Sequence, residues 1–184
     1  MVNFFNKKFF FVFFFALIIL ISFHRSPYIF LNSRFFAEEG YVHFQNAFQN
    51  SFFKNLFFIE LEAGYINFIA NILSSFAAKI PLIYAPYVTV YGSFFIILLP
   101  VYFILFRQSV LFDQNTKKIL GSLIFFISTP LVPEIWLNSI NLQIYLCLSS
   151  IIIIFMIDLN IYQKIINNIT IFIGSFSGIY TCSL

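Results

Sequence analysis

The sequence predicts an all-α integral membrane protein, a polytopic bundle of about five or six hydrophobic helices with amphipathic helices in its first external loop. The first observation behind this prediction is composition. Hydrophobic residues make up 61% of the 184 residues, phenylalanine alone supplies 30 of them, and charged residues make up only 9%. A soluble domain carries roughly 25% charged residues. The composition therefore excludes a soluble enzyme, a disulfide scaffold and a nucleic-acid-binding module.

The second observation is a series of apolar segments separated by short polar stretches. The segments cover residues 9–23, 64–80, 84–106, 119–132, 142–157 and 163–180. Several of them are shorter than the roughly 20 residues that a full membrane span prefers. Because no repeat or linker divides the chain, residues 1–184 are expected to form a single membrane domain.

The first apolar segment is expected to be an uncleaved transmembrane helix with its N-terminus in the cytoplasm. Lys7 and Lys8 precede the apolar run, as they would in a signal peptide, but no cleavage site of small residues follows it. Lys8 and Arg25 can place their charges at the two membrane boundaries, which compensates for the short apolar length.

Residues 24–62 form the longest polar stretch and are interpreted as an external loop that contains a juxtamembrane helix. Aromatic and small residues share one helical face, namely Tyr41, Phe44, Ala47, Phe48 and Phe52. Polar residues share the opposite face, namely Glu39, His43, Asn46 and Asn50. This period predicts an amphipathic helix in the membrane interface. The alternative is a loop that is rich in phenylalanine because the whole chain is.

The segment 64–80 either spans the membrane or lies along its surface, and the basic residues favour the second arrangement. A polar and small stripe runs along the segment, made of Asn67, Asn71, Ser74 and Ala78. Without a span here, four basic residues lie outside and six lie inside, namely Lys7, Lys8, Arg107, Lys117, Lys118 and Lys164. A span would leave three inside and seven outside, against the positive-inside rule.

Glu38 and Glu39 are the first candidates for chemistry, since they follow the expected outer end of the first helix. Apolar surroundings and a like-charged neighbour both raise the pKa of a carboxyl group, which suits one of the pair to act as a general base. The alternative is a solvated acid pair that stabilises a helix N-terminus. His43, four residues after Glu39, is expected to pair with it on the helix surface.

A second polar cluster lies between residues 133 and 143. Glu134, Asn138 and Asn141 are four and three residues apart, which predicts that they share one face of a helix. Polar side chains at membrane depth mark either hydrogen bonds between helices or a substrate cavity, and both readings stay open here.

Several short motifs together resemble the N-terminal part of a bacterial family of polytopic membrane glycosyltransferases of the GT-C type. They are Phe35-Phe36-Ala37-Glu38-Glu39-Gly40, Gly64-Tyr65-Ile66-Asn67, Asn141-Leu142-Gln143-Ile144-Tyr145 and Ser177-Gly178. The resemblance implies transfer of a sugar from a polyprenyl-phosphate donor to an acceptor at the outer face of the cytoplasmic membrane. The bilayer and the lipid-linked donor would be the partners, and we expect no metal or cofactor.

The resemblance also implies roles for individual residues. Glu39 occupies the position of an Asp in the family's motif and becomes the base that activates the acceptor, with Glu38 beside it. Glu is one methylene longer than Asp, and a general base depends on its position. A glycosyl phosphate leaving group needs nearby cations, and Arg34 and Arg25 lie in the same loop, so Arg34 is expected to bind the donor phosphate. The alternative is that these arginines only anchor the chain at the membrane boundary. The other expected substrate-binding residues are Tyr65, Asn138 and Asn141. Because GT-C enzymes are several hundred residues long, the chain is expected to be the N-terminal portion of a longer protein.

Two other functions remain open from the sequence. A non-catalytic membrane subunit or an inactive fragment would fit the chain length. A transporter or flippase would need polar residues along a path, for which Asn67, Asn71 and Asn141 are candidates. No pair of short helices indicates the inverted repeat that many transporters contain.

Overall fold

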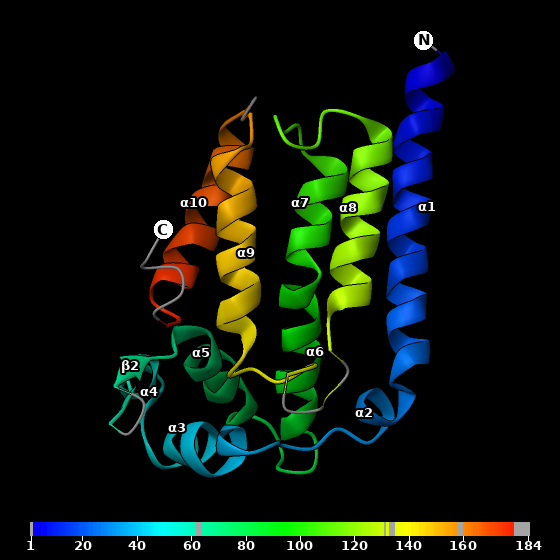
Figure 1. Cartoon of the computed structure of the whole chain (residues 1–184). Helices are drawn as coiled ribbons and strands as arrows, with labels where there is room; N and C mark the ends of the chain where they lie inside the picture. The colour runs from blue at the N-terminus through cyan, green and yellow to red at the C-terminus, as the bar shows by residue number, and fades with distance from the viewer. Residues whose placement is uncertain (1, 62–63, 131, 133–134, 158–159, 179–184) are drawn as a thin grey trace.

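A computed structural model of the chain describes residues 2–61, 64–130, 132, 135–157 and 160–178. The described chain is mostly helical, as the sequence predicts. The longer helices stand next to one another in a bundle, and short helices with a small hairpin lie across one end of it (Figure 1).

The bundle is built from helices that match the predicted apolar segments closely. They are α1 (Val2–Arg25), α6 (Ala85–Ile97), α7 (Leu99–Phe106), α8 (Asn115–Ser128), α9 (Leu142–Ile154) and α10 (Ile161–Ser175). α7 packs against α1, α8 and α9, while α10 packs against α9. Pro100 lies in the first turn of α7, where its missing N–H breaks no helical hydrogen bond, so α6 and α7 follow each other closely.

One helix of the described chain is long and apolar enough to cross a membrane. It is the rod formed by α6 and α7, Ala85–Phe106, with 22 residues. The other apolar helical stretches are shorter, at 10–17 residues. They are Phe9–Arg25 within α1, Phe68–Ala77 and Leu142–Ile154. A helix such as α9 is about 20 Å long, compared with about 30 Å for the hydrocarbon core of a bilayer. The helical class is therefore confirmed, whereas membrane-spanning length is shown for this one helix.

The short helices and the hairpin at one end of the bundle form what we call the end layer. It contains α2 (Pro27–Leu31), the π-helix η1 (Glu39–Phe44), α3 (Gln45–Gln49), α4 (Phe52–Leu56), α5 (Phe68–Ala77) and the strands β1 (Ile59–Glu60) and β2 (Tyr65–Ile66). The two strands pair in antiparallel fashion, with Glu60 opposite Tyr65. η1 leads directly into α3, and both pack on α5.

The structure corrects the expected juxtamembrane helix in two respects. The helix formed by η1 and α3 ends at Gln49, and Phe52 begins a separate helix. Its polar side is buried, because Glu39 and His43 are 0% and 1% exposed. Tyr41 and Phe48 point outward instead, with 64% and 68% of their surface exposed. Two aromatic rings therefore lie on the outside of this helix, whereas Phe44 and Ala47 of the predicted aromatic face are buried together with the polar residues.

α5 is the helix that residues 64–80 form in the described chain. The helix has 10 residues, which makes it about 15 Å long, and it lies within the end layer (Figure 1). It therefore does not run the length of the bundle. That this segment does not cross the membrane, as the basic residues favour, stays a prediction. The stripe residues Asn67, Asn71 and Ser74 are buried against the neighbouring elements.

The main hydrophobic core runs along the bundle, from Leu105 near the end of α7 to Phe30 and Trp136 at the end layer. Phe30 of α2 stacks on Phe23 of α1 with ring centroids 4.0 Å apart and meets Phe94 of α6 edge-on at 5.2 Å. Trp136, which precedes α9, is completely buried, and its Nε1 donates a hydrogen bond to Oγ of Ser26 at 2.7 Å. These contacts hold the loop before α9 against the start of the end layer.

Candidate functional site

Glu39, the predicted general base, is completely buried at the start of η1. Its Oε1 accepts two hydrogen bonds from Ser139, one from the backbone N–H at 3.0 Å and one from the hydroxyl at 2.6 Å. Its Oε2 accepts a longer bond of 3.4 Å from the N–H of Phe36. The carboxylate thus joins the loop after α2 to the loop before α9, which is 100 residues away in sequence.

Burial raises the pKa of Glu39, because water no longer solvates the charged form. The hydrogen bonds from Ser139, from the N–H of Phe36 and from the side chain of Thr89 act in the opposite direction, since they stabilise the charge. A raised pKa suits a general base at neutral pH, but a base must also come within hydrogen-bonding reach of its substrate. Glu38 is only partly buried. In this arrangement Glu38 is the member of the pair that a substrate can reach.

The backbone on both sides of this contact is strained. Ala37 and Leu137 have φ values of 47° and 60°, and they are the non-glycine residues with positive φ in the described chain. Ala37 lies two residues before Glu39, and Leu137 lies two residues before Ser139. Such conformations cost about 1–3 kcal/mol each and persist only where the surroundings hold them. The Glu39–Ser139 hydrogen bonds are the interactions placed to offset that cost.

The prediction that Asn138 and Asn141 share a helical face is wrong. Residues 135–141 form turns, and α9 begins at Leu142. The physical reason is local: Oδ1 of Asn138 accepts a hydrogen bond of 2.9 Å from the N–H of Ile140, and such a bond competes with helix formation. Asn138 is buried, whereas Asn141 is partly buried at the start of α9. Glu134 lies outside the described residues.

The other predicted site residues contact groups other than Glu39. The hydroxyl of Tyr65 accepts a hydrogen bond of 3.1 Å from Nε2 of Gln143, which ties the hairpin to α9. Arg34 is exposed, and its guanidinium group lies 5.0 Å from the centre of the Phe36 ring. Arg25 donates hydrogen bonds to the carbonyl oxygens at the C-terminal end of α8. Of the two arginines of this region, Arg34 is therefore the one exposed to solvent.

His43 does not pair with Glu39, contrary to the sequence-based expectation. Its Nδ1 lies 2.9 Å from Oδ1 of Asn71 on α5. η1 is a π-helix with a wider turn than an α-helix, so residues four apart do not stack one above the other as α-helical spacing assumes. Sequence spacing therefore gives no signal for this contact.

A network of buried amides fastens the end layer around α5. Nδ2 of Asn55 donates to the carbonyl of Asn71 at 3.0 Å and to the hydroxyl of Ser75 at 2.8 Å. Nδ2 of Asn46 donates to Oδ1 of Asn55 at 2.5 Å. Asn46 and Asn71 stand in the polar stripes that the sequence predicts, whereas Asn55 of α4 belongs to neither stripe. Their role in the structure is to join three short helices.

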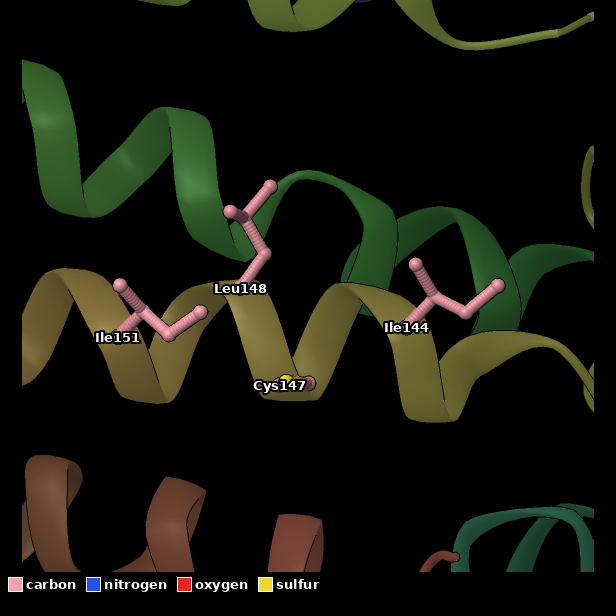
Figure 2. Close-up of a pocket in the computed structure, with 4 residues that line it drawn as sticks. All are labelled: Ile144, Cys147, Leu148 and Ile151. Atoms are coloured by element: carbon pink, nitrogen blue, oxygen red, sulfur yellow. The ribbon is translucent and has the colours of Figure 1, made fainter. Parts of the chain in front are cut away.

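A cavity lies against α9, away from the acid pair. It has a volume of about 310 Å³ and is lined by Ile144, Cys147, Leu148 and Ile151. Figure 2 shows Ile144, Leu148 and Ile151 on the side of α9 that faces a neighbouring helical ribbon. Its lining is apolar, so it suits a hydrocarbon group rather than a phosphate or a sugar.

Comparison with known proteins gives no match: no family model matches the sequence, and neither a curated protein nor a solved structure matches the chain. Within the described ranges, no group of three or more His, Cys, Asp or Glu side chains is arranged to hold a metal ion.

Proposed function

We propose that the chain is a GT-C-like module of a membrane glycosyltransferase that uses a polyprenyl-phosphate sugar donor. The observation that carries the proposal is the place of the acid pair. Glu38 and Glu39 lie at the start of η1, in a layer of short helices across one end of an apolar bundle (Figure 1). In a bilayer, this layer would lie at the depth of the lipid headgroups, where the phosphate and sugar of such a donor are found.

The distribution of basic residues supports an orientation with the acid pair outside. Arg107 follows α7, Lys117 and Lys118 lie in the first turn of α8, and Lys164 lies in the first turn of α10. These helix ends share the end of the bundle that holds the start of α1 (Figure 1). The positive-inside rule assigns that end to the cytoplasm. The end layer then faces the outer side of a bacterial cytoplasmic membrane, and the helix of membrane-spanning length, α6–α7, crosses it.

In the proposed reaction a carboxylate removes the proton from an acceptor hydroxyl, whose oxygen attacks the anomeric carbon of the donor. The bond between that carbon and the phosphate oxygen breaks, and polyprenyl phosphate leaves as the anion. Glu38 is the accessible carboxylate, and Glu39 becomes accessible only when Ser139 moves. Arg34, exposed in the same layer, is placed to attract the leaving phosphate.

The test uses the full chain in proteoliposomes with radiolabelled polyprenyl-phosphate hexoses, and it measures release of polyprenyl phosphate. Glu38→Gln and Glu39→Gln remove a carboxylate from the proposed site. Asp113→Asn is the matched control, because Asp113 is exposed and forms an ion pair with Lys117 next to α8. We expect Glu38→Gln to lose about 100-fold or more in rate, as for a lost general base, and the control to keep wild-type activity. Equal rates in all three variants, or no release by the wild type, would contradict the proposal.

One observation favours a second candidate, a non-catalytic membrane subunit. Glu39 is completely buried and accepts hydrogen bonds on both oxygens, as expected of a carboxylate that only holds two loops together. In that case neither glutamine variant changes transfer by a complex that contains the chain, and Glu39→Gln changes only its stability. The transporter alternative gains no support, because Asn67 and Asn71 are buried and donate to backbone carbonyls of the end layer and of Ile140.

A further inference from the structure

The short helices α4 and α5 bury polar side chains and expose aromatic ones. Asn55 of α4 and both Asn71 and Ser74 of α5 are completely buried. Phe53 of α4 is 76% exposed, and Phe76 of α5 is 54% exposed. Water favours the reverse arrangement, because it drives apolar surface inward and hydrates amides and hydroxyls readily. The outer side of these two helices is therefore suited to an apolar neighbour.

The exposed rings of α4 and α5 belong to one continuous surface, which we call the aromatic patch. It consists of Phe52, Phe53, Lys54, Phe76 and Lys79. The ring of Phe52 meets Phe53 edge-on with centroids 5.8 Å apart, and it meets Phe76 edge-on at 5.5 Å. Lys54 directly follows Phe53, and the N–H of Lys79 donates to the carbonyl of Phe76 at 3.1 Å. Both lysines are exposed, so two cations accompany the three rings.

The lysines limit the kind of apolar neighbour that the patch can have. A charged side chain is costly in the hydrocarbon core of a bilayer, so the ammonium groups of Lys54 and Lys79 must stay hydrated. The headgroup region meets both demands, because aromatic rings and the heads of lysine side chains are both favourable at that depth. α4 and α5 lie in the layer across one end of the apolar bundle, where such a region would be (Figure 1).

The exposed charges around the patch are of one sign. Between residues 26 and 84, the charged side chains that the described chain exposes are all basic, namely Arg34, Lys54 and Lys79. The described acids of this stretch are partly or completely buried, namely Glu38, Glu39 and Glu60. Basic residues at a membrane surface are attracted to anionic lipids. The charge of the end layer is thus complementary to an anionic lipid surface.

A second copy of the chain would fit the patch less well than lipid does. In a two-fold symmetric dimer the same patch meets itself. Such a pairing of the aromatic patch would bring Lys54 and Lys79 of one copy close to the same lysines of the other, and like charges repel. A lipid headgroup region supplies negative charge at the same place.

We propose that the aromatic patch is a lipid-binding surface, which lies in the headgroup region of the bilayer and binds anionic phospholipids in preference to zwitterionic ones. The rings of Phe53 and Phe76 enter the boundary between headgroups and acyl chains, while Lys54 and Lys79 attract the net negative charge of the headgroups. A lysine near the surface contributes about fivefold to this attraction. The surface serves a catalytic chain and a non-catalytic one equally, so it does not depend on sugar transfer.

The test uses the full chain in bilayer nanodiscs made of equal parts of phosphatidylcholine and phosphatidylglycerol. One of the two lipids is brominated near the headgroup, and bromine quenches the fluorescence of a tryptophan that it contacts. The wild type gives the background, because Trp136 is its only tryptophan and is completely buried. Phe53→Trp and Phe76→Trp each place a reporter in the patch. We expect both reporters to be quenched, with phosphatidylglycerol binding about fivefold or more better than phosphatidylcholine.

Two further variants make the test specific. Phe95→Trp is the matched control, because Phe95 is 68% exposed on α6, a helix without charged residues. Its reporter should respond equally to the two brominated lipids. Lys54→Gln combined with Lys79→Gln, in the chain with the Phe53→Trp reporter, should keep the quenching but reduce the preference for phosphatidylglycerol to near one. Because Phe53 and Phe76 are both exposed, either reporter alone suffices if the other variant does not fold.

Three outcomes would overturn the lipid-binding surface. Quenching of both patch reporters no greater than the background would mean that water or protein, such as a second copy of the chain, covers the patch. Equal quenching by the two lipids would refute the preference for anionic lipid. A preference that persists without Lys54 and Lys79 would show that these lysines do not cause it.

Discussion

Removal of the Glu39 side chain is the sharpest test of how the two loops are held together. Glu39→Ala leaves the backbone N–H and the hydroxyl of Ser139 without an acceptor, in a position where Ser139 is 0% exposed. A buried donor without a partner costs about 1–3 kcal/mol, so the two together cost about 2–6 kcal/mol. Because the variant also removes a carboxylate that is costly to bury, we expect a net loss of about 2–4 kcal/mol in the free energy of unfolding.

Glu39→Gln distinguishes the contribution of the hydrogen bonds to stability from the contribution of the charge. The amide oxygen can still accept both bonds from Ser139, whereas the bonds from Phe36 and Thr89 are at risk, so we expect a change of about 1–2 kcal/mol. The pH dependence differs as well. Since the pKa of Glu39 is raised above its ordinary value of 4.5, the folded chain binds this proton more tightly than the unfolded chain. Its contribution to stability is complete below pH 4.5 and is lost as pH rises through the folded-state pKa, a loss that Glu39→Gln should abolish.

The measurement is unfolding by SDS in mixed micelles, followed by the fluorescence of Trp136. This is the only tryptophan of the sequence, it is fully buried, and it lies three residues before Ser139. Far-UV circular dichroism measured in parallel distinguishes release of the loop from unfolding of the bundle. Ser149→Ala is the matched control, because it removes a buried hydroxyl that bonds only to Tyr145 within α9. If Glu39→Ala is no less stable than this control, the contact with Ser139 does not hold the loops and the argument fails.

Three further predictions follow from the same geometry. Asn71→Leu removes bonds to His43 and to two backbone carbonyls, so it should cost about 3 kcal/mol or more and strongly reduce hydrogen-exchange protection of the hairpin; unchanged protection would contradict the assigned network. A Cβ on Gly92 would lie 2.5 Å from Leu73, so Gly92→Leu should separate α5 from α6 and lower the unfolding midpoint by several degrees, whereas Gly92→Ala should be milder. In a chain without its native cysteines, Gln114→Cys should react with an impermeant thiol reagent only from the cytoplasmic side, and Phe53→Cys only from the outer side; labelling of both from one side would refute the orientation.

The sequence by itself determined the helical class and the positions of the bundle helices. Apolar runs such as 84–106 and 142–157 indicate their helices because the signal is local, and Pro100 marks the junction of α6 and α7 for the same reason. The number of membrane-length helices did not follow from the sequence. An apolar run shows which residues avoid water, but not the residue at which a helix ends, as the early end of α9 at Ile154 demonstrates.

Only the tertiary structure decided which polar groups are buried and what they contact. Ser139 lies 100 residues from Glu39, so no local pattern relates them, and their bonds depend on how the loop before α9 docks on the end layer. The same is true of His43 and Asn71, which are 28 residues apart. Periodicity divides a helix into a polar and an apolar side. Which side is enclosed depends on the neighbouring element. The polar side of η1 is buried because it packs against the polar stripe of α5, where His43 contacts Asn71.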